Sequence, residues 1–389
     1  MLYARLFRSG LLCAIAACSD PDAPAPASSA AELFDRFVAL GTSNSMGVQY
    51  AGIFGAGQRA AWPAQLASRV RTSFSMPLVQ DPGCGPPLSP PLAKDLAVVG
   101  ALGGGFVNVV SGTCAPLERG ITLPTNNVAI SGADVHDALV ATPESKGDAR
   151  TATLYRRVLA AGQTQVTAML AQKPTFVSVE LAANDVLPAS TGRVSAMTPY
   201  ANWERDYDAV LAAVKSTGAG AVLVGLPNDA AAFPSIRPAR EFAAESAALV
   251  GLGIRVRAEC AQSTNSLFIP GYVLTLAARV PATATCADVP GAADYVLTTE
   301  DIAAINAQMA RMNAHIKAKA AEYGYAYFSL DAVYALPKPA FSVSGLLFSN
   351  SPFGTNISLD GVHPSAQGQG LLAVAAAQAI SAKYGVAIP

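Results

Sequence analysis

The stretch "FVALGTSNSMG", from Phe37 to Gly47, places an apolar run directly before a glycine and two serines. The run is typical of a buried β-strand, and the small residues after it indicate a tight turn. A serine at such a turn is either a helix cap or a nucleophile, and a hydroxyl reacts well only when a base removes its proton. Ser43 is therefore a candidate nucleophile whose role depends on what the rest of the chain brings beside it.

Strand-like and helix-like segments alternate along the chain. Besides the first strand, short apolar runs predict strands within 126–132, 175–180, 219–225 and 325–330. Apolar residues at three- and four-residue spacing predict helices from about 133 and over 151–172, 199–218, 298–324 and 365–385. Strands that are apolar on both faces and alternate with helices indicate a doubly wound α/β/α sandwich of three layers, with about five parallel strands. Ligands of such sheets bind beyond the carboxyl ends of the strands.

The first eighteen residues have the composition of an export signal. Arg5 and Arg8 precede a short apolar core and small residues, as in a secretory signal peptide. The end of this segment resembles a bacterial lipobox, in which Cys18 would be lipidated; an ordinary signal peptide cut nearby is the alternative. Residues 19–31 are rich in Pro, Ala and Ser and predict a flexible tether before a single domain at 32–389. Ser19 favours an exported outer-membrane lipoprotein, facing the periplasm or the cell surface.

The overall composition limits the class of partner. Of the 389 residues, 51% are hydrophobic and 14% charged, which excludes a disordered chain, and the net charge of −1 leaves no basic surface for nucleic acid. Apart from the N-terminus, no apolar segment is long enough to span a bilayer. The three histidines are scattered and no His-Glu-x-x-His occurs, so neither a metal centre nor another cofactor is expected. Small molecules are the expected ligands.

Four further cysteines agree with export. An even number in an oxidising compartment indicates disulfides, and their positions favour Cys84–Cys114 and Cys260–Cys286 among three possible connectivities. Each bond would close a loop of roughly 30 residues and stabilise the fold by about 3.5 kcal/mol. A zinc site would need Cys-x-x-Cys pairs, and the sequence has none. The two pairs lie within 75–126 and 230–297, which fit the alternating pattern poorly and are interpreted as loop insertions that form walls or lids of a site.

Among the three histidines, one has the surroundings of a general base. His136 falls in the first turn of a helix, and His315 lies in a polar stretch in the middle of another. His363 instead lies in the loop "SLDGVHPSAQG", three residues after Asp360. Asp360 could hold one ring nitrogen and leave the other to act as base, although a turn followed by a helix cap explains the same spacing.

A serine that attacks a carbonyl also needs donors for the oxyanion that forms. Three stand at predicted strand ends: the N–H of Ser43, the N–H of Gly132 and the side chain of Asn184. Each also has a plain structural explanation as a turn or cap residue. Their convergence with Asp360 and His363 at one edge of the sheet favours the functional interpretation.

These residues give the chain a resemblance to the SGNH hydrolases, the GDSL-type esterases and lipases, over almost all of the chain after the tether. "GTSNSMG" resembles the block that carries the nucleophile, Ser43, and "NVAISGADV" the block of the oxyanion glycine, Gly132. "AAND" resembles the block with the oxyanion asparagine, Asn184, and "DGVHPS" the block with Asp360 and His363. The resemblance implies a flavodoxin-like fold and a serine esterase or lipase without a cofactor, acting on a small-molecule or lipid ester.

Two residues depart from the pattern of that family. Thr42 stands where the family has aspartate, and Ala182 where it has glycine. A surface-tethered binding protein that keeps the fold without turnover therefore stays open as an alternative. A carbohydrate O-acetylesterase is a second alternative, because the folds of the family serve both acyl lipids and acetylated sugars. Ser45 is a rival nucleophile that matches no block, and the Gly-x-Ser-x-Gly signature of another hydrolase class is absent.

Overall fold

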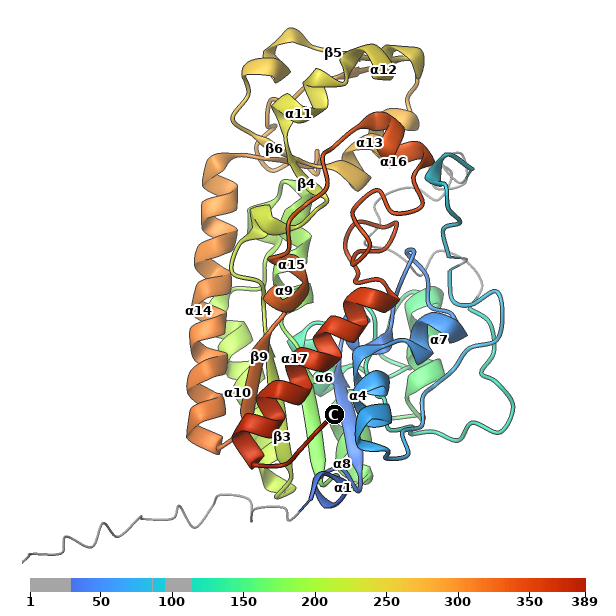
Figure 1. Cartoon of the computed structure of the whole chain (residues 1–389), viewed down its shortest axis with the longest axis vertical. Helices are drawn as coiled ribbons and strands as arrows, with labels where there is room; N and C mark the ends of the chain where they lie inside the picture. The colour runs from blue at the N-terminus through green and yellow to red at the C-terminus, as the bar shows by residue number, and fades with distance from the viewer. Residues whose placement is uncertain (1–28, 86, 95–113) are drawn as a thin grey trace, which may run out of the picture.

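The computed structural model describes residues 29–85, 87–94 and 114–389, and a parallel sheet lies at its centre (Figure 1). Four strands pair in the order β1 (Phe37–Gly41), β2 (Phe176–Glu180), β3 (Gly220–Gly225) and β9 (Ala326–Ser329). All three neighbouring pairs are parallel, and every residue of β1, β2 and β3 is buried. This confirms the α/β class with a parallel sheet.

The fifth expected strand is present only as an irregular edge segment. Residues 126–130 run parallel to β1, and the N–H groups of Val128 and Ile130 donate to the carbonyls of Ala39 and Gly41. The chain thus leaves β1 toward this edge and then returns to form β2 on the other side. Such a reversal of strand order is the switch point at which doubly wound sheets bind ligands. The sheet proper therefore has four strands, and its switch point lies at the end of β1.

Helices cover both faces of the sheet. On one face, α6 (Val135–Val140), α8 (Gln165–Ala171), α10 (Tyr200–Ser216) and α14 (Thr299–Tyr323) pack their apolar sides on alternate residues of the strands. On the other, α4 (Trp62–Val70) and α17 (Ala366–Tyr384) pack on the remaining strand residues and on α1 (Ala30–Leu33). Capping residues mark both ends of α14: Thr298 and Asp301 form a capping box, and Gly324 ends that helix in the left-handed conformation.

One helix prediction was wrong. The segment 151–172 forms two helices, α7 (Ala149–Val158) and α8, instead of one. Gly162 between them has φ +71°, a conformation that breaks a helix, and Thr164 then caps α8 through the N–H of Thr167. The apolar spacing continues across the break, so periodicity alone could not locate it.

Residues 230–297 form a layer of their own beyond the carboxyl end of the sheet (Figure 1). This stretch was expected to be a loop insertion, but it has regular structure. An antiparallel sheet is formed by β4 (Ile236–Pro238), β6 (Ser266–Phe268) and β8 (Val296–Leu297). A separate pair is formed by β5 (Ile254–Val256) and β7 (Ala282–Ala284). The helices α11 (Ala239–Ala244), α12 (Ser246–Gly251) and α13 (Ile269–Ala277) accompany them. We call residues 230–297 the upper layer.

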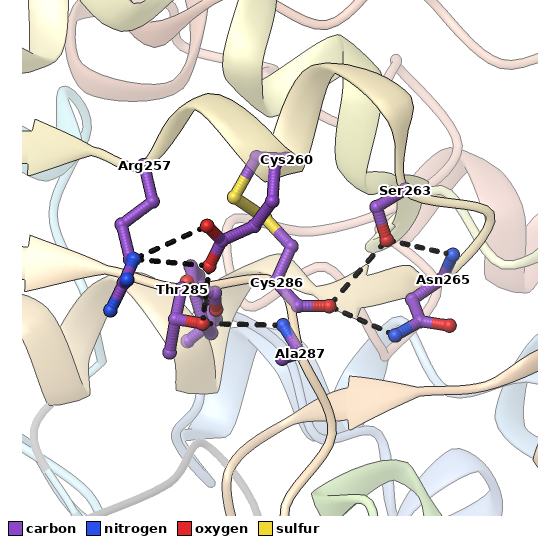
Figure 2. Close-up of a disulfide and its surroundings, with 9 residues drawn as sticks. Arg257, Cys260, Ser263, Asn265, Thr285, Cys286 and Ala287 are labelled. Carbon is purple, nitrogen blue, oxygen red and sulfur yellow. Dashed lines mark hydrogen bonds and ion pairs between the residues drawn. A yellow bond between two sulfur atoms is a disulfide. The ribbon is translucent and has the colours of Figure 1, made fainter.

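A disulfide joins Cys260 to Cys286 inside the upper layer (Figure 2). Asn265 donates a side-chain hydrogen bond of 2.9 Å to the carbonyl of Cys286, which ties the backbone next to the disulfide to a neighbouring segment. A second disulfide joins Cys84 to Cys114. Both pairings are those that the sequence analysis favoured.

The remaining elements are short: α2 (Ser43–Met46), α3 (Gly55–Arg59), α9 (Ala183–Val186), α15 (Asp331–Tyr334), α16 (Val343–Phe348), and the 3-10 helices Leu92–Lys94, Leu187–Thr191, Val194–Ala196, Ala230–Ala232 and Ala258–Gln262. Within the described ranges, no helix combines the length and apolar character needed to cross a membrane. The expected signal peptide, Cys18 and nearly all of the tether lie outside the described residues.

Candidate active site

Ser43 lies in the first turn beyond β1, as the first residue of α2. Thr42 is the N-cap of that helix, and the turn is tight because a Cβ on Gly41 would lie 2.5 Å from Oγ of Ser45. The Ser43 side chain is nearly buried, and its Oγ forms no hydrogen bond with any described residue. The hydroxyl therefore faces the switch point of the sheet without a competing partner.

His363 and Asp360 form a hydrogen-bonded pair in the loop before α17. Nδ1 of His363 lies 3.0 Å from Oδ2 of Asp360, which is fully buried. The Asp360 carboxylate also accepts the N–H groups of Ala51, Val362 and His363 at 2.8–2.9 Å. Burial alone raises the pKa of Asp360, but the charge of His363 and these hydrogen bonds outweigh burial and leave that pKa below its usual value. An ionised Asp360 keeps the proton of the ring on Nδ1 and leaves Nε2 able to act as base.

The loop that carries His363 is held in one shape from several sides. The hydroxyl of Tyr334 donates to the carbonyl of Val362 at 2.6 Å, and the N–H of Ser358 donates to the carbonyl of His363 at 2.8 Å. Gly361 has φ +72°, and a Cβ there would lie 2.9 Å from the ring of Phe353. Only glycine fits both the backbone and the space, so the base is positioned before any substrate binds.

Asn184 and the turn that contains Gly132 lie at neighbouring strand ends, and a hydrogen bond to Ala133 joins them. Asn184 lies in α9, directly after β2, and its Nδ2 donates to the carbonyl of Ala133 at 2.8 Å. Gly132 has φ +82° in the turn that follows the edge segment, where a Cβ would meet no atom within 4 Å. Glycine is thus needed at 132 for its backbone conformation, and the Asn184 amide keeps one N–H available after binding this turn.

A pocket, with about 730 Å³ of empty space that includes space open to solvent, collects most of these groups. Ser43, Asn184 and His363 line it, with Asp360 directly behind His363. Gly132 does not line it, although its neighbour Ala133 binds Asn184. The rest of the wall is almost entirely apolar: Ala183, Val186, Leu187, Leu226, Pro227, Ala230, Phe233, Ile236, Phe268, Ile305, Met309, Leu330, Tyr334 and Val362, with Asn44 and Ser190. We call the part lined by these apolar residues the apolar chamber.

The upper layer therefore contributes a wall of the cavity, as expected for residues 230–297. Its contribution is Ala230, Phe233, Ile236 and Phe268. The other insertion, 75–126, lines no part of the cavity with the residues that the structure describes.

The other candidate residues lie elsewhere or have other partners. His136 contacts Asp206, and His315 contacts Asp208, so both histidines face the outer helix α10. Ser45 points away from the cavity: its Oγ donates to Glu180 at 3.0 Å and accepts the indole N–H of Trp62 at 3.2 Å.

Glu180, the last residue of β2, was missed by the sequence analysis. Its carboxylate lies under the Ser43 turn and accepts the N–H groups of Thr42 and Ser45 at 3.0 and 3.2 Å. Both hydroxyl groups of these residues also donate to it. Burial raises the pKa of Glu180, and the hydrogen bonds from Thr42 and Ser45 act in the opposite direction. The signal in the sequence was a single acidic residue at the end of an otherwise uncharged strand, "FVSVE".

Asp185 is a second buried acid beside the site. Its Oδ2 accepts the N–H of Val135 at 3.2 Å, while its Oδ1 has no hydrogen-bond partner among the described residues. Burial raises the pKa of Asp185 to about 7.

The two departures from the family pattern have structural explanations. The hydroxyl of Thr42 donates to Glu180 at 2.9 Å, so this side chain supports the turn of the nucleophile. Ala182 has φ 177°, outside the left-handed region that favours glycine, so its φ does not require the glycine of the family.

In the described part of the chain, no group of three His, Cys, Asp or Glu residues could hold a metal ion.

Residues 37–376 match the sequence model of the GDSL-like Lipase/Acylhydrolase family. No curated protein matches the chain.

Proposed function

We propose that the chain, which belongs to the GDSL-like lipase and acylhydrolase family, hydrolyses carboxylic esters with Ser43 as nucleophile, His363 as base and Asp360 as the residue that orients His363. The observation that carries this proposal is the pairing of Nδ1 of His363 with the buried Asp360, while His363 and Ser43 line one cavity. Ser43 is more than 300 residues away in the sequence from the Asp360–His363 pair, and both lie at the switch point of the sheet, where such folds bind ligands.

The reaction proceeds in two halves. Nε2 of His363 accepts the proton of the Ser43 hydroxyl as Oγ bonds to the ester carbonyl, and the oxyanion is held by the N–H of Ser43 and by the Asn184 amide. The N–H of Gly132, in the turn that Asn184 binds, is the proposed third donor. His363 then gives its proton to the departing alcohol, which leaves an acyl group on Ser43. Water attacks this acyl-enzyme with His363 again as base, and the acid leaves as Ser43 regains its proton.

A labelling experiment tests this proposal. A fluorophosphonate probe should modify the folded, disulfide-intact protein at Ser43, and Ser43→Ala should abolish both labelling and ester hydrolysis. Ser45→Ala, two residues away in the same turn, is the matched control and should still be labelled. Continued hydrolysis by Ser43→Ala would refute the role of Ser43. A wild-type protein that resists the probe would support the alternative of a binding protein without turnover.

The apolar chamber favours esters with an aliphatic acyl group over acetylated sugars. A sugar needs polar partners, while the chamber offers apolar side chains from Leu226, Ile305 and Met309 next to the catalytic groups. An acetyl group would leave most of this wall in contact with water, whereas each buried methylene of a longer chain contributes about 0.8 kcal/mol. A lipid ester or another long-chain ester is therefore the proposed substrate class.

Hydrogen bonds tie residues 230–237, which form one wall of the chamber, to the surrounding structure. The N–H of Ala230 donates to the side chain of Asn306 at 2.7 Å, and Lys338 donates to the carbonyl of Ile236 at 3.0 Å. Arg237 donates to the carbonyl of Pro339, outside this segment, at 2.9 Å. These bonds hold the backbone of 230–237 from outside, which lets its apolar side chains face the cavity.

Chain-length profiles test the substrate class. The kcat/KM of p-nitrophenyl esters should rise from acetate to octanoate in the wild type. Ala230→Leu, which fills the chamber, should lower kcat/KM for octanoate roughly tenfold or more and leave acetate little changed. Ala310→Leu, on the exposed side of α14, is the matched control and should match the wild type. A preference for acetate that Ala230→Leu does not alter would favour the O-acetylesterase alternative.

For location, the proposal is an outer-membrane lipoprotein anchored through Cys18. The basis is the N-terminal sequence alone. Wild-type protein expressed in bacteria should incorporate radiolabelled palmitate, and Cys18→Ser should not. Incorporation that Cys18→Ser leaves unchanged would contradict the anchor.

A further inference from the structure

We propose that Glu180 is a positioning residue that fixes the Ser43 turn and leaves the N–H of Ser43 free for the oxyanion. This inference rests on the proposed function. It concerns a buried acid that the two-step mechanism does not use.

The contacts of Glu180 surround Ser43 on both sides. One carboxylate oxygen, Oε2, accepts the backbone N–H groups of Thr42 and Ser45, the residues one before and two after Ser43. Side-chain donors add to these: the hydroxyls of Thr42 and Ser45 at 2.9–3.0 Å and Nδ2 of Asn44 at 3.4 Å. Every partner is a donor, which suits a carboxylate that only accepts. Residues 42, 44 and 45 are thus tied to one side chain, and Ser43 between them is not.

Glu180 also replaces the normal cap of α2. The first N–H groups of a helix lack partners inside the helix, and an N-cap threonine usually accepts one of them with its hydroxyl. Thr42 occupies the N-cap but makes no such bond, because its hydroxyl turns to Glu180. The N–H of Ser45, the third in the helix, is accepted by Glu180 instead. The Ser43 N–H has no acceptor among the described residues, so it is available to the cavity.

The Glu180 side chain is buried and closely packed under the Ser43 turn. Glu180 is only 2% exposed, and a Cβ on Gly41 would lie 3.1 Å from its Oε2. The pairing of Gly41 with Glu180 in the register of β1 and β2 brings the carboxylate under the turn. The neighbouring strand therefore sets the direction of the Ser43 N–H and Oγ.

Glu180→Gln is the test, because it keeps the size of the side chain but puts an amide N–H₂ against donors. Fluorophosphonate titration to completion gives the number of reactive Ser43 sites, and kcat is expressed per site. We expect kcat to fall roughly 10- to 100-fold, somewhat less than for loss of an oxyanion donor, with KM within about twofold of the wild type. A purely structural residue would lower the melting temperature and the number of sites without changing kcat per site.

Two further variants keep the test decisive. Ser178→Ala changes another buried polar residue on the same face of β2, and kcat per site should stay at the wild-type value. If Glu180→Gln does not fold, Thr42→Val removes one donor to Glu180 and should still lower kcat per site several-fold. An unchanged kcat per site in Glu180→Gln, or in Thr42→Val where the first does not fold, would overturn the positioning role. Lack of Ser43 labelling in the wild type would instead overturn the proposed function.

Discussion

The two sides of the cavity differ in origin. The polar side consists of Ser43, Asn184 and His363, which follow β1, follow β2 and precede α17. The apolar side comes in part from the upper layer and α14, and in part from the segments that follow β2, β3 and β9. Parallel strands end at one edge, so the polar side follows from the topology of the sheet. The apolar side depends in addition on how the upper layer packs over that edge. The proposed chemistry therefore belongs to the polar side, and the proposed preference for long acyl groups belongs to the apolar side.

The largest effect is expected from a substitution that disables only the polar side of the cavity. Asp360→Asn should lower kcat by roughly 10⁴-fold, because an asparagine does not hold the tautomer of His363 that leaves Nε2 as base. The ratio of octanoate to acetate hydrolysis should stay the same, since the apolar chamber is untouched. Steady-state kinetics on both esters measure the two quantities. A changed ratio at reduced kcat would show that the two sides are not independent.

Asn184→Ala is the next test of the polar side. Loss of one oxyanion donor should lower kcat by about 10²–10³-fold, with a smaller change in KM. Asn184 also binds the carbonyl of Ala133, so Asn184→Asp is a useful companion that keeps the size but offers no N–H. A kcat near the wild-type value in both variants would remove Asn184 from the mechanism.

The disulfide Cys260–Cys286 tests the apolar side. Replacing both cysteines with serine should lower the free energy of unfolding by about 2–4 kcal/mol, as expected for a loop of this size. Where the protein remains folded, octanoate hydrolysis should fall more than acetate hydrolysis, because Phe268 and Ile236 belong to the layer that the bond closes. Denaturant melts and the two-ester assay measure both. Equal losses on both esters would mean that the upper layer also supports the polar side.

The smallest effect concerns Asp185 and pH. Burial raises the pKa of Asp185 to about 7, so between roughly pH 4 and pH 7 the folded state holds a proton that the unfolded state has lost. This contribution to stability is complete below the unfolded pKa and is lost as pH rises through the folded pKa. Asp185→Asn removes it, so the melting temperature of the wild type should fall relative to that of the variant across this window. Parallel melting curves that keep a constant difference from pH 4 to pH 8 would contradict the raised pKa.

Much of the sheet and of the polar side could be predicted from the sequence. The runs around Leu40, Val179 and Val222 are short and apolar, so their strand character is local information. Asp360 and His363 are three residues apart, and their hydrogen bond needs only one turn of chain. The sequence did not predict the helix break near Gly162, because the apolar spacing continues through it. It also did not predict that residues 126–130 would be irregular, because that depends on their having only β1 as a neighbour.

The sequence by itself determined the order of the strands of the central sheet and of most helices around it, the pair Asp360–His363, and which residues follow the strand ends. These depend on contacts within a few residues or on the single rule that parallel strands end together. Only the tertiary structure decided that Glu180 lies under the Ser43 turn and that Phe268 and Met309 face one chamber. Those contacts join segments more than 100 residues or about 40 residues apart, and packing selects such partners through shape and burial, which no local pattern encodes.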